Sequence, residues 1–162
     1  MQQMSPLDWA MRPLKRYAEF SGRSPRAEYW WFWLGYMVLS IILQILTRIS
    51  SIFGILGILY LGLIVPMIAV GVRRMHDIDR TGWWILAPAL PYFLGIAMIL
   101  PTLFSGQGPS LGNGFGAAMA FFLVAFVLAI VVFVFSLLPG TTGPNRFGPD
   151  PYDEEQLEEV FA

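Results

Sequence analysis

The charged residues of this chain fall in separate blocks, and long uncharged stretches divide them. Residues 29–47, 49–72 and 81–145 contain no Asp, Glu, Lys or Arg. Placing a charge in the hydrocarbon of a bilayer costs free energy, so uncharged apolar stretches of this length are typical of membrane-spanning segments. Only 13% of all residues are charged, whereas soluble domains usually contain about a quarter. The sequence therefore predicts an integral membrane protein.

The lengths of these stretches predict an all-α membrane protein with four transmembrane helices. About 20 mostly apolar residues cross a bilayer, so the first two stretches hold one helix each. The third holds two helices, joined by the Gly- and Pro-rich segment 105–114. We expect the spans at residues 30–47, 52–72, 83–104 and 117–138. The transmembrane domain, residues 29–138, then lies between an amphipathic N-terminal segment, 1–28, and a turn motif with an acidic tail, 139–162.

The positions of the basic residues predict the orientation of these spans. Nine of the ten Lys and Arg residues precede the first span, lie between the second and third, or follow the fourth, and Arg48 is the exception. Lys and Arg accumulate in cytoplasmic loops of membrane proteins. We therefore expect both termini of the chain to lie in the cytoplasm.

Several local patterns refine this picture. Ser5-Pro6 is typical of a helix start, and apolar residues then recur at helical spacing, which predicts an amphipathic helix on the inner leaflet or against the protein's own surface. The prolines at 88, 91 and 101 predict a bent or broken third span. In the fourth span, the small-residue pairs 116/120 and 125/129 predict close helix packing. Four tryptophans are predicted interface anchors, with ligand stacking as the alternative: Trp30, Trp31, Trp83 and Trp84.

Three polar clusters stand out between the apolar stretches. They are FSGRSPRAEYWW at Phe20–Trp31, RRMHDIDRTGWW at Arg73–Trp84, and PGTTGPNRFGPDP at Pro139–Pro151. The four-span topology places all three at one cytoplasmic boundary, although they are far apart in the sequence. We call the charged and polar residues of these clusters the polar cap.

The three clusters together resemble domain-of-unknown-function family 805 (DUF805), which comprises small bacterial inner-membrane proteins. The resemblance runs from about Phe20 to Pro151. It rests on the segments Gly22-Arg23, Arg26, Glu28-Tyr29-Trp30, Arg73-Arg74-Met75-His76-Asp77, Arg80, Gly82-Trp83-Trp84 and Gly143-Pro144-Asn145-Arg146-Phe147-Gly148. Pro25, Thr81 and the long uncharged outer hairpin depart mildly from the family pattern. The resemblance implies a four-span membrane protein and supplies no activity or catalytic residue.

The polar cap has two physical interpretations. Arg presents a planar fork that suits either a carboxylate or a phosphate. The cap is therefore either a layer of ion pairs that clamps helix ends together, or a binding site for an anionic lipid headgroup or another phosphate. The candidate residues are Arg23, Arg26, Glu28, Arg73, Arg74, His76, Asp77, Arg80, Asn145, Arg146 and Asp150.

Other chemistry has little support in the sequence. His76-Asp77 suggests acid–base chemistry, but adjacent residues on a helix do not face each other, and no nucleophile motif accompanies them. The chain has no cysteine and a single histidine, and no metal-ligand spacing occurs. We expect no catalytic residues, no metal, no cofactor and no nucleic-acid partner.

We therefore expect a non-enzymatic membrane protein that binds anionic lipid headgroups or partner proteins through the polar cap. The alternative is a small oligomeric channel or transporter, although the predicted spans contain no ionisable Asp, Glu, Lys, Arg or His of the kind that coupled transport uses. A third possibility is an enzyme at the membrane interface, with His76 and Asp77 as its candidates. The expected partners are membrane lipids, and also a second copy of the chain or other membrane proteins.

Overall fold

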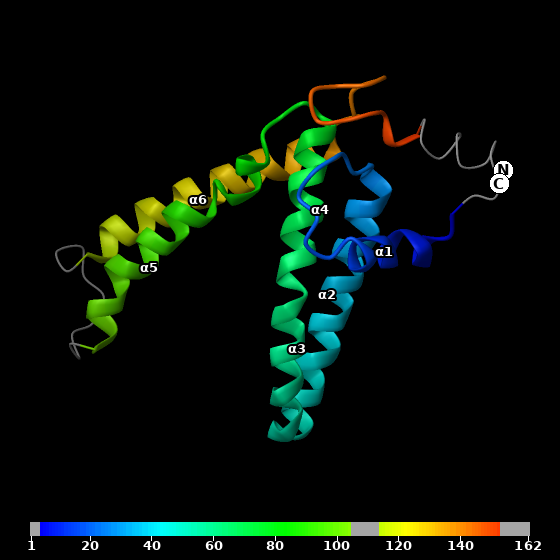
Figure 1. The fold of residues 1–162 in the computed structure, drawn as a ribbon. Coiled ribbons are helices and arrows are strands. Elements are labelled where there is room, and N and C mark those ends of the chain that lie inside the picture. Colours follow the sequence, from blue (N-terminus) through cyan, green and yellow to red (C-terminus); the bar gives the residue numbers. More distant parts are fainter. Residues whose placement is uncertain (1–3, 105–113, 153–162) are drawn as a thin grey trace. The chain divides into compact units, whose positions relative to one another are not determined.

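The computed structural model describes residues 4–104 and 114–152, and every regular element in these ranges is a helix (Figure 1). The chain divides into two compact units, each described by itself below. The first unit comprises Met1–Gly82 and Pro139–Ala162, and the second comprises Trp83–Leu138. The charged residues of the polar cap therefore all belong to the first unit.

Four helical segments are long and apolar enough to cross a membrane, which confirms the predicted fold class. Their bounds are Arg26–Ile49, Leu56–Asp77, Gly82–Thr102 and Phe115–Leu137. The predicted ends differ most at the second span, which begins at Leu56 rather than residue 52 and ends at Asp77 rather than residue 72. Most of the predicted outer hairpin, residues 105–113, and the acidic tail from residue 153 lie outside the described residues.

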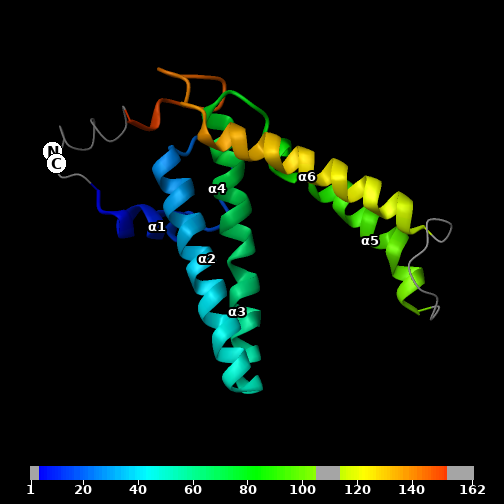
Figure 2. The same ribbon diagram turned by 180° about the vertical axis from the view of Figure 1, so that it is seen from behind.

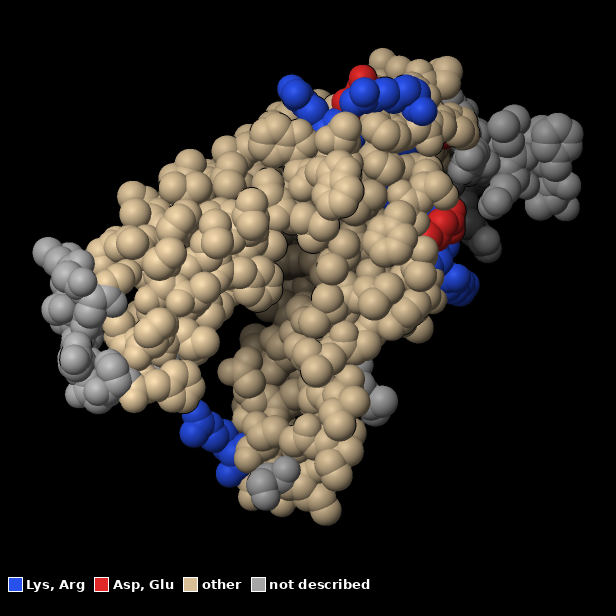
Figure 3. Space-filling view, turned by 60° about the vertical axis from the view of Figure 1, so that its left-hand side comes forward, with Lys and Arg blue, Asp and Glu red and all other residues tan. Residues whose placement is uncertain are grey.

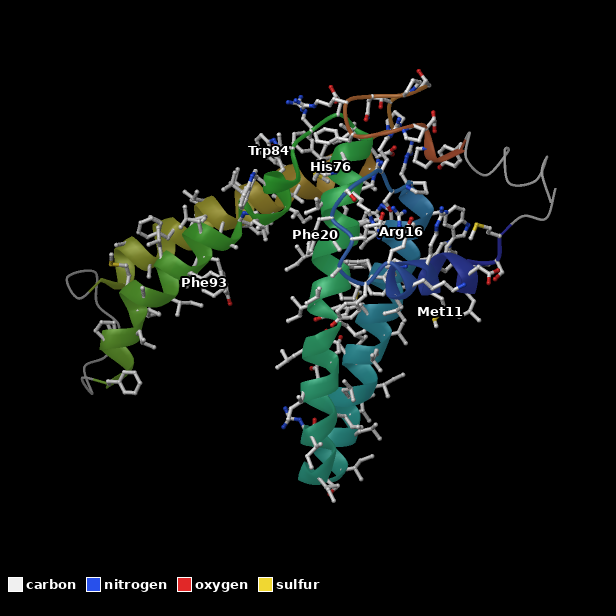
Figure 4. All side chains as sticks on the ribbon, viewed as in Figure 1. Met11, Arg16, Phe20, His76, Trp84 and Phe93 are labelled. Atoms are coloured by element: carbon white, nitrogen blue, oxygen red, sulfur yellow. The ribbon has the colours of Figure 1, made fainter. Side chains whose placement is uncertain are left out.

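The N-terminal helix, α1 (Pro6–Lys15), begins where the sequence predicts it. The Ser5 hydroxyl accepts a hydrogen bond from the Asp8 N–H, and the Asp8 carboxylate accepts one from the Ser5 N–H, which satisfies donors that the helix itself cannot pair. Leu14 packs against the buried core of the unit. Leu7 is 69% exposed and Met11 46% exposed, and Figure 4 shows Met11 pointing away from the other helices. The helix thus packs on the protein and also leaves apolar side chains uncovered.

The first two spans form the long part of the first unit. The first is a single helix, α2 (Arg26–Ile49), and the second runs beside it as two helices (Figures 1 and 2). These are α3 (Leu56–Gly62) and α4 (Ile64–Asp77), and the 3₁₀ helix η1 (Ser51–Ile55) precedes them. Tyr29 and Phe32 of α2 meet Val70 of α4 in the buried core. Because this core lies near the start of α2 and the end of α4, it supports the polar cap directly.

Pro66 interrupts the backbone hydrogen bonding of the second span near the junction of α3 and α4. Proline has no N–H, so the carbonyl of Gly62, four residues earlier, loses its helical donor. The Tyr17 hydroxyl donates to this carbonyl at an O···O distance of 2.5 Å. The segment after α1 therefore supplies the hydrogen bond that the proline removes, and this contact attaches the N-terminal segment to the second span.

The second span ends later than the charge pattern predicts. The pattern predicts that Arg73, Arg74, His76 and Asp77 lie between two spans, but α4 continues through Asp77. Arg73 and Arg74 are fully buried, and Asp77 is 2% exposed, so their charges meet protein groups rather than lipid. Charge alone does not end a helix, because the helix dipole favours basic side chains in the last turn.

The second unit is a helical hairpin of α5 (Ala89–Phe104) and α6 (Phe115–Leu137), preceded by the 3₁₀ helix η2 (Gly82–Leu86). On α6, Ala118, Ala125 and Val132 are buried, and this seven-residue recurrence is typical of two helices packed at a shallow angle. Of the predicted small-residue positions, Ala125 is buried, whereas Ala120 and Ala129 are exposed in this hairpin, so close contact at those two stays a prediction. On α5, a Cβ at Gly95 would lie 2.7 Å from the Phe122 ring, so the two helices approach closely there.

The third span is broken rather than continuous. η2 ends at Leu86 and α5 begins at Ala89, with a turn between them. Pro88 explains the turn, because the residue before a proline disfavours the α conformation. Pro91 lies in the first turn of α5, where the helix needs no N–H from it. Only Pro101 of the three lies well inside the helix.

Candidate functional site

The three polar clusters are in contact in the first unit. The Ser24 N–H donates to the Arg73 carbonyl at 3.1 Å, and the Thr141 N–H donates to the Asp77 carbonyl at 2.8 Å. Backbone hydrogen bonds therefore join the segment before α2 to α4, and α4 to the segment after Pro139. Figure 3 shows Lys, Arg, Asp and Glu side chains gathered over this end of the unit.

Asp77 is the centre of the buried part of the polar cap. Its Oδ1 accepts a hydrogen bond from Arg23 Nε at 3.0 Å, and its Oδ2 accepts one from Arg74 Nη1. The other two guanidinium nitrogens of Arg23 donate to the carbonyls of Gly143, at 2.6 Å, and Thr141, at 2.5 Å. Arg23 is 5% exposed. Its donors are thus shared between a buried carboxylate and two loop carbonyls, which fixes the three segments together.

A second buried ion pair lies on the side of the cap near α1. Arg73 Nη2 is 2.9 Å from Glu28 Oε1, and both side chains are fully buried. Arg12 Nε lies 3.9 Å from Glu28, and Glu19 Oε2 lies 3.9 Å from Arg73, which is too far for direct hydrogen bonds. Glu19 is bonded to Arg16, which holds the pKa of that carboxyl below its usual value. Alternating charges therefore run from α1 to α2 and α4.

His76 and Asp77 have different partners. The Nδ1 atom of His76 lies 3.1 Å from the Gly22 carbonyl, and its ring stacks on Phe147 with centroids 4.0 Å apart. Figure 4 shows His76 near the end of α4. Asn145 Nδ2 donates to the His76 carbonyl at 2.9 Å. Because the Asp77 carboxylate is bonded to two Arg side chains, it does not orient the imidazole as an acid–base dyad requires.

The segment 139–152 is shaped by side chain–backbone hydrogen bonds. The Asp150 carboxylate accepts from the N–H groups of Gly143 and Tyr152 at 3.0 and 3.1 Å. Gly140 lies so close to the Asp77 carboxylate that a Cβ there would overlap it. On the outer side, Arg146 donates to both the carboxylate and the carbonyl of Asp79, at 3.0 and 2.8 Å. This last pair is exposed, so it contributes little to stability.

A cavity of about 160 Å³ opens between these segments. Arg23 and Arg26 line it together with Asp77, Thr142 and Asp150. Within the described chain, Arg26 makes no hydrogen bond or ion pair, and it is exposed. Among the described residues, Arg26 is therefore the charged side chain of the cavity that makes no hydrogen bond or ion pair.

The remaining predicted residues lie in two settings. Arg80 is exposed, and its N–H donates to the Met75 carbonyl at 2.9 Å, which closes the end of α4. Trp31 is 39% exposed and Trp83 is 77% exposed, whereas Trp30 packs against the buried core and Trp84 lies edge-on to Phe135. Their role as interface anchors stays a prediction.

Three residues that shape the cap are absent from the predicted site residues: Tyr17, Thr141 and Phe147. Thr141 and Phe147 lie in the third polar cluster, but nothing in the sequence indicates their contacts. For Tyr17, the only signal is Pro66, which predicts that a carbonyl of the second span needs another donor. Among residues 4–104 and 114–152, no three His, Asp or Glu side chains are grouped as a metal site requires. The interactions that the described cap shows are ion pairs and hydrogen bonds to backbone carbonyls.

Comparison with known proteins places this arrangement in a family. Residues 17–149 match the family described as "Protein of unknown function (DUF805)". The inner membrane protein YhaH of Escherichia coli (strain K12) is 32% identical over 157 residues, which cover 90% of this chain and 97% of YhaH. The inner membrane protein YhaI of the same strain is 31% identical over 147 residues, which cover 90% of this chain and 96% of YhaI. No solved structure matches the chain. The resemblance inferred from the three motifs is confirmed, and the chain belongs to the DUF805 family.

Proposed function

We propose that this protein is a non-enzymatic protein of the bacterial inner membrane whose cytoplasmic polar cap binds the phosphate of an anionic lipid headgroup. The membrane location is supported by four candidate spans and by the similarity to two inner membrane proteins. The orientation is supported by nine of the ten Lys and Arg residues, which the four-span topology puts on one side. In this orientation the cap lies at the level of the anionic headgroups of the inner leaflet.

The main support for lipid binding is that Arg26 has no carboxylate partner among the described residues. Arg23, Arg73, Arg74 and Arg146 each pair with a carboxylate, whereas Arg26 has no such partner in the described chain. Its charge also lies close enough to that of Arg74 to repel it. A phosphate bound by Arg26 relieves this repulsion, and the guanidinium group offers parallel N–H donors that match two phosphate oxygens.

The charged side chains around the cavity have a net charge of one positive unit, which suits a bound group with one negative charge. Arg23 and Arg26 line the cavity together with Asp77 and Asp150, and Arg74 is bonded to Asp77. Three guanidinium groups thus accompany two carboxylates. A phosphodiester, which carries one negative charge, completes the balance, and the cavity of about 160 Å³ has room for a phosphate group. The exposed apolar side chains of α1, Leu7 and Met11, suit the same headgroup region.

Native mass spectrometry of the gently purified protein tests this proposal. We expect the wild-type protein to retain an anionic phospholipid selectively, and Arg26→Ala to lose at least about 10-fold of that retention, because a hydrogen bond to a charged group is removed. Arg26→Lys keeps the charge and should lose less. Arg48→Ala removes an arginine at the opposite end of α2 and serves as the matched control.

The choice of Arg26 keeps the experiment interpretable. Arg73 and Arg74 are fully buried in ion pairs, so their removal would damage the fold as well as any site. Arg26 is exposed and unbonded within the described chain, so its removal should leave thermal unfolding unchanged. Equal lipid retention by the wild type and a folded Arg26→Ala variant would contradict the proposal and leave the cap as an ion-pair clamp.

A further inference from the structure

The apolar residues of α1 form a stripe that the first unit covers at one end only. Leu7, Met11 and Leu14 are spaced by four and three residues, which places them on one side of the helix. Leu14 packs against the buried core of the unit. Leu7 is 69% exposed and Met11 is 46% exposed. The described part of the first unit therefore covers the end of the stripe and leaves its N-terminal part open.

Charged side chains border the exposed part of this stripe. Asp8 and Lys15 are exposed, and they lie about 80–100° around the helix from Leu7. Arg12 lies farther round on the same side, with its guanidinium carbon 5.6 Å from the centre of the Trp9 ring. The exposed surface of α1 thus changes from apolar to charged across its width. This division is typical of a helix that lies along a membrane surface.

The contacts of the N-terminal segment show how these two surfaces are arranged along the spans. Arg12 Nε lies 3.9 Å from the carboxylate of Glu28, which is in the first turn of α2, at the end that carries the polar cap. The Tyr17 hydroxyl reaches the carbonyl of Gly62, which lies about four helical turns before Asp77. The charged side of the segment therefore lies toward the polar cap, and its apolar side extends toward the middle of the spans.

Figure 4 shows the same direction of polarity. Arg16 lies on the side of α1 toward the polar cap, and Met11 lies on the opposite side, toward the middle of α2. The exposed apolar stripe thus lies at the level where the uncharged stretches of the spans begin. Because such stretches occupy the hydrocarbon of the bilayer, lipid acyl chains are the surroundings that match the stripe.

We propose that α1 lies in the lipid leaflet next to the polar cap, with Leu7 and Met11 inserted among the acyl chains and Asp8 and Lys15 at the headgroups. The apolar side of such a helix is typically buried about 5–10 Å into the boundary between headgroups and acyl chains. The packing of Leu14 holds the helix on the spans and so fixes its depth. This lipid contact is separate from the phosphate proposed to bind Arg26, because it depends on apolar insertion and not on an ion pair.

Spin labels at single cysteines test this placement in the whole chain, which contains no cysteine of its own. The protein is reconstituted in vesicles of phosphatidylethanolamine and phosphatidylglycerol. Each label is then tested for collisions with oxygen, which concentrates in hydrocarbon, and with a nickel chelate, which stays in water. Labels at Leu7→Cys and Met11→Cys should have a several-fold higher ratio of oxygen to nickel collisions than labels at Asp8→Cys and Lys15→Cys, the matched controls on the charged border.

Two results would overturn the proposal. Labels at Leu7→Cys and Met11→Cys that are shielded from both reagents would show that protein covers the stripe, and labels that collide mainly with the nickel chelate would place it in water. Thermal unfolding confirms that each labelled variant is folded. The same ratios are expected in an Arg26→Ala background, so loss of the phosphate site and loss of the inserted helix are distinguishable.

Discussion

At the scale of single residues, Asp77 accepts hydrogen bonds from Arg23, Arg74 and Thr141, which come from all three segments of the polar cap. Its carboxylate accepts from Arg23 and Arg74, and its carbonyl accepts from the N–H and the hydroxyl of Thr141. A buried carboxylate is tolerated only while its charged partners stay in place. Asp77 therefore holds the segment before α2 and the segment 139–152 against the end of α4.

The substitution Asp77→Asn tests this role against a neighbouring control. It keeps the shape of the side chain but leaves two buried guanidinium groups without a counter-charge, so we expect a loss of about 3–5 kcal/mol in the free energy of unfolding. Asp79→Asn removes the partner of Arg146 in an exposed pair, where about 0–1 kcal/mol is expected. Thermal unfolding followed by circular dichroism in detergent compares them, and similar small losses in both variants would refute the central position of Asp77.

The sequence predicts which residues gather in the cap better than it predicts how they pair. Arg74 and Asp77 are three residues apart on a helix, so their pairing follows from spacing. The hydrogen bonds of Arg23 to the carbonyls of Thr141 and Gly143 cannot be predicted from spacing, because every residue has a backbone carbonyl and the sequence does not show which one is used. The adjacency of His76 and Asp77 is misleading for a related reason, since each side chain finds its partner on a different segment.

At the scale of elements, the N-terminal segment is attached to the second span by packing and by a hydrogen bond. Leu14 packs against the buried core, and the Tyr17 hydroxyl bonds to the Gly62 carbonyl. Pro66 predicts from sequence alone that a carbonyl is freed. The donor is not predictable, because it comes from a segment whose position on the spans depends on tertiary packing.

Tyr17→Phe isolates this hydrogen bond. The ring is kept, but the Gly62 carbonyl loses its donor beside a proline, so the free energy of unfolding should fall by about 1–3 kcal/mol. Trypsin should also cut faster near Lys15 and Arg16, because the segment is less firmly attached. Tyr92→Phe is the control, since the Tyr92 hydroxyl has no hydrogen bond within the described chain. Unchanged unfolding and unchanged cleavage in Tyr17→Phe would show that packing alone fixes the segment.

The number of spans follows from composition, whereas the end of the second span follows from tertiary structure. Charge marks where hydrocarbon stops, but α4 continues through Arg73, Arg74 and Asp77 because these groups pair inside the protein. Pro88 explains the break before α5. Pro91 and Pro101 are in the same span but lie within α5 and do not end it. Uncharged length is thus a reliable guide to a span, and the position of a charge is a poor guide to a helix end.

At the scale of the whole molecule, the distribution of charge predicts how the chain is oriented in the membrane. The charged residues of the cap come from three separate segments, and all belong to one compact unit. If the four candidate spans all cross the bilayer, these segments are expected at one face and Arg48 at the other. The proposed lipid binding requires this face to be cytoplasmic, because the proposed ligands of the polar cap are anionic lipids of the inner leaflet.

The measurement that tests this arrangement most directly is labelling of single cysteines from each side of the membrane. The chain has no cysteine of its own, so Ser21→Cys, Thr81→Cys and Thr142→Cys each report one polar cluster, and Arg48→Cys reports the opposite end. With a membrane-impermeant maleimide, the three cluster positions should react in inverted vesicles and not in intact spheroplasts, and Arg48→Cys should do the reverse. Reaction of any cluster position only from the outside would contradict the four-span topology and the common cytoplasmic cap.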